Sequence, residues 1–170
     1  PILEVRDVFR ILEQSANRSL ELEHKALRLA GRLLDLCLKA RDKNYKKGDG
    51  EEMAREMLQS GKALAKMKDI IKIQGGNSHI TAQSLKLGKY TYEVKSTKKG
   101  RVVAVNNHEI AVIARIAGSP NDKQAGVFLE RQLEERVDKG DILCTLYSSD
   151  KWRLQEAVDT LIHMPMYKIG

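Results

Sequence analysis

EIAVIARIAGSPNDKQAGVFLERQLEERVDKGDILCTLYS, residues 109–148, carries three local signals in a fixed order, and it indicates the fold class of the second half. Its first part has apolar residues at helical spacing and ends at Gly118-Ser119-Pro120, which is a strong helix stop. Apolar residues then alternate with others over 127–129 and again over 142–146, which predicts two paired strands. A helix, a polar loop and antiparallel strands in succession predict an α+β domain.

Further short elements surround this stretch. Strands are predicted at 90–94 and 102–105, as a hairpin across the turn Lys98-Lys99-Gly100. A helix is predicted at 150–163, with Asp150 as its N-cap. A short strand over 166–169 follows it.

The first 76 residues are predicted to be helical, with helices at 2–14, 19–40 and 62–73 and another that begins at Asp49. Asp49 and Glu52 have the spacing of a capping box. Residues 77–88 are the predicted linker between domains.

The helix at 19–40 is apolar over more than half of its circumference. One stripe has steps of three and four residues, and a second widens it: Leu22, Ala26, Leu29, Leu33 and Leu36, then Leu27, Ala30, Leu34 and Cys37. A helix of this kind is expected to pack between neighbours on two sides, including chain outside these 170 residues.

Composition excludes several classes of protein. The chain is 42% hydrophobic and 31% charged, as in ordinary globular proteins. No apolar run is long enough to span a bilayer, and no signal peptide is apparent, so we expect a cytoplasmic protein with no membrane partner. Lys and Arg outnumber Asp and Glu by 16 to 12 over residues 1–76 and by 14 to 11 over 77–170. Because this surplus is evenly spread and aromatic residues are only 5% of the chain, we expect no nucleic-acid partner.

Three blocks of sequence, in family order, resemble the thymidine phosphorylase family, which includes pyrimidine-nucleoside and AMP phosphorylases. They are ILEVRDV at 2–8, SGKAL with IKIQGGN at 60–64 and 71–77, and IARIAGSPNDKQAG with VDKGDIL and LY within 113–147. Ser119 and Gln124 depart from the family's usual Ala and Gly, which affects loop detail.

The resemblance implies both a fold and an activity. Residues 1–76 would belong to the catalytic core, residues 77–88 would be a linker, and residues 89–170 would form a C-terminal α/β-hammerhead domain of the barrel-sandwich kind. A parent protein would cleave the N-glycosidic bond of a pyrimidine nucleoside or AMP with phosphate, releasing the base and a (deoxy)ribose 1-phosphate. The family's phosphate-binding and base-binding residues lie upstream of the segment that matches Ile2. We therefore expect this chain to be an inactive C-terminal piece of a pentosyltransferase, completed by the upstream part of the same protein and forming a homodimer.

The alternative function is a non-catalytic module, either a biotinyl or lipoyl carrier or a protein-interaction domain. VDKGDIL resembles half of a carrier domain. A carrier needs a modifiable lysine at an exposed hairpin tip, and the surroundings of Lys99 and Lys151 do not match that pattern.

Glu4 is the one residue to which the resemblance gives a possible metal role. In the family, the carboxylate at this position is associated with a monovalent-cation site, and potassium prefers several oxygen ligands. The simpler interpretation is an acidic residue that complements the dipole in the first turn of a helix. No organic cofactor is expected, and phosphate would be a co-substrate.

Asp122 and Lys123 are the other candidates, as a charged latch in a loop that closes toward a substrate cleft. The competing interpretation is ordinary turn chemistry between a helix and a strand. The four histidines are too widely separated in sequence to suggest a metal site or a catalytic pair. Cys37 and Cys144 are expected to be reduced thiols.

Overall fold

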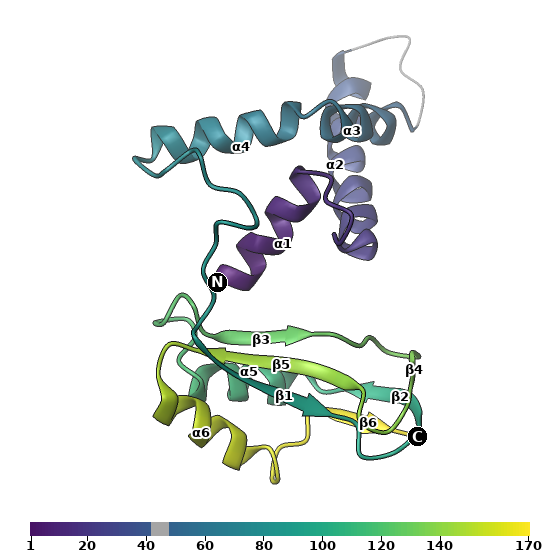
Figure 1. Ribbon diagram of the computed structural model, residues 1–170. Helices are drawn as coiled ribbons and strands as arrows, with labels where there is room; N and C mark the ends of the chain where they lie inside the picture. The colour runs from purple at the N-terminus through teal and green to yellow at the C-terminus, as the bar shows by residue number, and fades with distance from the viewer. Residues whose placement is uncertain (42–47) are drawn as a thin grey trace. The chain divides into compact units, whose positions relative to one another are not determined.

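The computed structural model describes residues 1–41 and 48–170, which form two compact units (Figure 1). One unit is Val5–Leu85, and the other combines Pro1–Glu4 with Lys86–Gly170. The described residues contain six helices and two small antiparallel sheets, so the predicted α+β class is confirmed. None of the described helices is long and apolar enough to cross a membrane.

Helices form the unit Val5–Leu85, in agreement with the periodicity of its sequence. They are α1 (Ile2–Leu12, whose first turn is grouped with the other unit), α2 (Leu20–Arg41), α3 (Asp49–Gln59) and α4 (Lys62–Ile73). Its core is small, because it consists of Ile11, Leu27, Ala54 and Leu58. No residue of α4 is buried, and Ile70 is 44% exposed.

Two glycines allow α2 and α3 to approach closely. A Cβ atom on Gly50 would lie 2.3 Å from the carbonyl oxygen of Gly31, so no larger residue fits without a shift of backbone. The predicted capping box at Asp49 is wrong, because the N-cap of α3 is Gly48 and it makes no side-chain cap bond. Asp35 of α2 caps α3 instead, since its carboxylate accepts a hydrogen bond from the Gly50 N–H at 2.8 Å.

The other unit combines two three-stranded sheets with two helices. Its elements are β1 (Tyr90–Lys95), β2 (Gly100–Val105), α5 (Asn107–Ile116), β3 (Gly126–Leu129), β4 (Arg136–Val137), β5 (Ile142–Ser148), α6 (Lys151–Thr160) and β6 (Tyr167–Ile169). The sheet orders are β1-β5-β3 and β4-β2-β6. The predicted pairing of β3 with β5 is confirmed, with Val127 opposite Leu146. The predicted hairpin of β1 and β2 is wrong, because the two strands enter different sheets.

Both helices cover one face of the sheet β1-β5-β3. Cys144 and Leu146 of β5 share a core with Ile113 of α5 and with Leu154 and Ala157 of α6. Each helix begins at a side-chain cap, Asn106 for α5 and Asp150 for α6. The predicted cap at Asp150 is therefore confirmed.

Candidate functional site

The loop between α5 and β3 is organised around the carboxylate of Asp122. One oxygen accepts hydrogen bonds from the N–H and the hydroxyl of Ser149, at 3.0 and 2.6 Å. The other oxygen accepts the Gln124 N–H at 2.9 Å. Burial works against ionisation, but the bonds from Ser149 and Gln124 outweigh it and lower the pKa of Asp122 below its ordinary value. Asp122 therefore stays ionised and ties this loop to the corner between β5 and α6.

A second bond at the same corner supports the loop. The buried Ser148 hydroxyl donates to the carbonyl oxygen of Ala117, at the end of α5, at 2.7 Å. Gly118 follows with a φ of +122°, and a Cβ atom there would lie 3.1 Å from the Cβ of Asp122. The turn therefore requires glycine at this position.

The backbone of the loop also forms hydrogen bonds with two other segments of this unit, one that contains Ile2 and one that contains Gly88. The carbonyl oxygen of Lys123 accepts the Ile2 N–H at 3.0 Å, and that of Gln124 accepts the Gly88 N–H at 3.0 Å. The Lys123 ammonium group donates to the Pro120 carbonyl oxygen at 3.0 Å. Asp122 and Lys123 thus shape a junction in which the loop is hydrogen-bonded to the segments at Ile2 and at Gly88.

Glu4, the possible cation ligand, does not belong to a group of ligands in the part of the chain that the structure describes. Its side chain is 87% exposed. The described residues contain no group of three or more His, Cys, Asp or Glu side chains that could hold a metal ion. One exposed carboxylate does not form a potassium site, so the described residues do not fit this ion.

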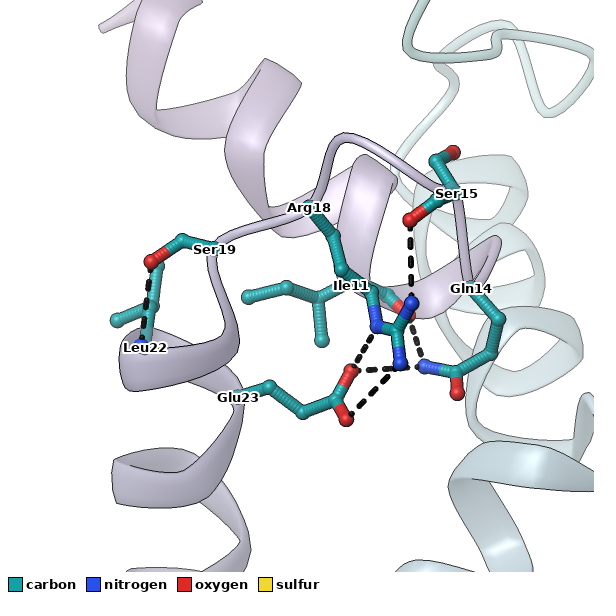
Figure 2. Close-up of polar contacts among 7 residues, drawn as sticks. All are labelled: Ile11, Gln14, Ser15, Arg18, Ser19, Leu22 and Glu23. Carbon is teal, nitrogen blue, oxygen red and sulfur yellow. Dashed lines mark hydrogen bonds and ion pairs between the residues drawn. The ribbon is translucent and has the colours of Figure 1, made fainter. Parts of the chain in front are cut away.

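Glu23 is a buried carboxylate that sequence reasoning missed. It lies on α2, is only 6% exposed, and receives the Arg18 guanidinium at 2.5 Å and the Gln14 amide at 3.0 Å, as Figure 2 shows. The hydrogen bond from Arg18 is the main reason that the pKa of Glu23 is lowered. The amide of Gln14 also donates to the Ile11 carbonyl oxygen at 2.7 Å. This cluster fixes the turn between α1 and α2.

An apolar groove of about 510 Å³ lies beside this cluster, and we call it the α2 groove. Its walls are almost wholly apolar. They come from all four helices of the unit and are formed by Val8, Ile11, Leu12, Leu22, Glu23, Ala26, Leu27, Ala30, Leu33, Leu34, Ala54, Met57, Leu58 and Ala63. With Glu23 already bound to Arg18, the groove presents no free catalytic group and suits apolar packing.

The remaining reactive side chains do not form a catalytic centre in the part of the chain that the structure describes. Cys144 is buried, and burial raises the pKa of its thiol to about 12, while Cys37 is exposed. Burial also raises the pKa of Tyr167, whose single O–H is shared between the carbonyl oxygens of Arg131 and Leu143 at 3.0 and 2.9 Å. Cys144 and Tyr167 belong to the core that α5 and α6 share with β5.

Known proteins match this chain over most of its length. Residues 101–167 match the C-terminal domain of pyrimidine nucleoside phosphorylases. The AMP phosphorylase of Methanosarcina barkeri is 41% identical over 161 residues, which are 94% of this chain and 30% of that protein. The chain carries the C-terminal domain of pyrimidine nucleoside phosphorylases and is similar to part of the AMP phosphorylases. The resemblance inferred from the three sequence blocks is confirmed.

Two further relatives give the same result. The AMP phosphorylase of Methanococcoides burtonii is 36% identical over 98% of this chain and 32% of its own length. AMP phosphorylase 1 of Archaeoglobus fulgidus is 36% identical over 94% of this chain and 30% of its own length. The chain thus spans about a third of these relatives and carries the family's C-terminal domain from residue 101.

Proposed function

We propose that this chain is part of a longer phosphorylase. AMP is the first substrate to test. The observation that supports this proposal is its similarity, over 94% of the chain, to proteins named AMP phosphorylase. In the reaction, phosphate displaces adenine from C1 of the ribose. The N-glycosidic bond breaks, a C–O bond to phosphate forms, and the products are adenine and ribose 1,5-bisphosphate. Thymidine and uridine are the second class, because the matched domain is that of pyrimidine nucleoside phosphorylases.

This chain would contribute structure rather than chemistry to such an enzyme. Phosphorolysis requires groups that position phosphate and stabilise charge on the departing base. The described residues present no cluster suited to either task. The junction around Asp122 and Lys123 would instead set the geometry of a loop beside a substrate cleft completed by the rest of the enzyme. A homodimer in the cytoplasm is part of the same proposal.

Base release tests the proposal. The longer protein would be incubated with AMP, thymidine or uridine, with and without phosphate, beside the 170-residue chain alone. We expect release of adenine that depends on phosphate, from the longer protein only. Failure to release any of the three bases would refute the proposed activity, and release without phosphate would indicate a hydrolase.

The carrier alternative is not favoured. The relatives are phosphorylases, and Lys99, in the turn between β1 and β2, forms an ion pair with Asp138 at 3.0 Å.

A further inference from the structure

The outward face of α6 carries a large aromatic side chain where a surface helix normally carries polar ones. The helix packs on the sheet β1-β5-β3 through Leu154 and Ala157 (Figure 1). By helical spacing Trp152 lies on the opposite face, and it is 85% exposed. Tryptophan is highly buried on average, and it is enriched among the residues that contribute most to binding at protein interfaces.

The rest of this face is acidic. An open groove of about 500 Å³ runs along it, and we call its lining residues the α6 face: Trp152, Gln155, Glu156, Asp159, Thr160 and His163. The α6 face contains two carboxylates and no lysine or arginine, although the chain as a whole has a net charge of +7.

Both carboxylates are available to a partner. Neither Glu156 nor Asp159 forms an ion pair with a described residue, although Arg153 lies only three positions before Glu156. Asp159 accepts a hydrogen bond from the Gln155 amide at 2.8 Å through one of its oxygens. An exposed indole ring beside two such carboxylates suits a cationic side chain, because the ring face attracts the cation and the carboxylates pair with it.

The same charges disfavour other occupants. Two copies of the α6 face brought together about a twofold axis would place carboxylates against carboxylates, and an anionic membrane would meet the same repulsion. A metal ion is not favoured either, since the described residues contain no group of three or more His, Cys, Asp or Glu side chains placed to hold one.

We propose that the α6 face is a docking surface for a basic segment of another protein. An arginine of that segment stacks on the Trp152 indole, and neighbouring basic side chains pair with Glu156 and Asp159. Arginine suits this face better than lysine, because its planar guanidinium stacks on aromatic rings. The inference does not depend on the proposed phosphorylase activity.

Intrinsic fluorescence tests this assignment directly, because Trp152 is the only tryptophan of the chain. When the 170-residue chain is titrated with a nona-arginine peptide, we expect a saturable change in Trp152 emission that weakens as salt is added. Nona-lysine should bind at least about threefold more weakly, and nona-glutamate should leave the emission unchanged. No saturable change with nona-arginine, or an equal response to nona-glutamate, would overturn the proposal.

A pair of double variants separates the α6 face from the overall charge of the protein. Glu156→Gln with Asp159→Asn should weaken nona-arginine binding at least about tenfold. Glu21→Gln with Glu52→Gln removes the same charge from exposed positions on α2 and α3, and it should weaken binding less than about twofold. Equal weakening in the two double variants would show that the peptide responds only to net charge, which would overturn the proposal.

The contribution of the indole ring is measured by the fluorescence anisotropy of a labelled nona-arginine peptide. Trp152→Ala should weaken binding at least about fivefold, and Trp152→Phe should weaken it less. Since Trp152 is 85% exposed, both variants should keep the melting temperature within about 2 °C of the wild-type value. Binding to Trp152→Ala as tight as to the wild-type chain would overturn the stacking role.

The same anisotropy measurement on the longer protein of the proposed function completes the test. Binding that is retained there, and that Glu156→Gln with Asp159→Asn again weakens, would support the docking surface. Loss of binding would show that the rest of that protein or a second copy covers the α6 face, and would overturn the proposal. Peptide binding by a longer protein that releases no base would keep the docking surface and refute the phosphorylase proposal, whereas base release without peptide binding would do the reverse.

Discussion

At the residue scale, Asp122 shows how one carboxylate can hold several segments of the chain together. It accepts three hydrogen bonds from two residues, one of them 27 positions away in the sequence. Asp122→Asn would replace an acceptor oxygen by an amide that donates. We expect the free energy that protects this corner from opening to fall by about 1–2 kcal/mol.

Hydrogen exchange of the Ser149 and Gln124 amides measures that change directly. Asp138→Asn is the control, because Asp138 is exposed and pairs only with the exposed Lys99 among the described residues. Its effect should stay within about 0.5 kcal/mol. Unchanged exchange at both amides in Asp122→Asn would contradict the role given to Asp122.

Glu23 makes the stability of the helical unit dependent on pH. Its folded pKa lies below the ordinary value of 4.5, mainly because Arg18 donates to it. The stabilisation is therefore complete above about pH 4.5 and is lost as the pH falls through the folded pKa. Glu23→Gln should lower the unfolding free energy at pH 7 by about 1–3 kcal/mol, and the difference from wild type should shrink in acid.

Urea denaturation from pH 7 down to pH 3, with helix content followed by far-ultraviolet circular dichroism, measures how the unfolding free energy depends on pH. Glu21→Gln is the matched control, since Glu21 is exposed on the same first turn of α2 and forms no ion pair with a described residue. A difference between Glu23→Gln and wild type that stayed constant with pH would be evidence against the linkage.

At the element scale, the contact of α2 with α3 depends on two glycines. Gly50→Ala would place a methyl group 2.3 Å from the Gly31 carbonyl oxygen and 2.6 Å from the Asp35 carboxylate that caps α3. The helices would have to separate, which should destabilise the unit by about 1–3 kcal/mol. Denaturant midpoints compared with those of Glu52→Ala, an exposed change on the same helix, test this expectation. Equal midpoints would show that the contact is looser than described.

The caps of α5 and α6 contrast with that of α3. Asn106 and Asp150 cap their own helices within two or three residues, so local sequence was enough to identify Asp150. α3 is capped by Asp35 of another helix, a partner that sequence spacing does not reveal. Asp150→Ala should cost about 1 kcal/mol, measured as faster amide exchange at Trp152 and Arg153, whose N–H groups it accepts. Exchange as slow as in wild type would contradict this cap.

At the scale of the whole molecule, the two thiols report on the two units separately. Cys37 is exposed in the helical unit, whereas Cys144 is buried under α5 and α6 with a pKa of about 12. At pH 8 a disulfide reagent should label one thiol per chain quickly, because burial keeps the Cys144 thiol protonated and away from the reagent. Labelling of both thiols should become fast in denaturant. Two fast thiols in the native chain would show that the sheet core is open.

The sequence alone predicted the elements well wherever the signal was local. Alternation over 127–129 and 142–146 identified a true strand pair, and helical periodicity located most of the helices. Pairing between distant segments was harder to predict. The turn at Gly100 suggested a hairpin, yet β2 pairs with β4 and β6, because its buried Val102 packs with Val137 and Leu143 instead.

The sequence by itself determined the α+β class, the family resemblance and the apolar stripe of α2, because these depend on residue order and on the local spacing of apolar side chains. Only the tertiary structure decided which polar groups meet: Asp122 with Ser149, Glu23 with Arg18 and Gln14, and Asp35 with the start of α3. Such contacts join turns and helices whose spacing carries no periodic signal. They are set by where the packed elements bring a buried carboxylate to the N–H groups that it must satisfy.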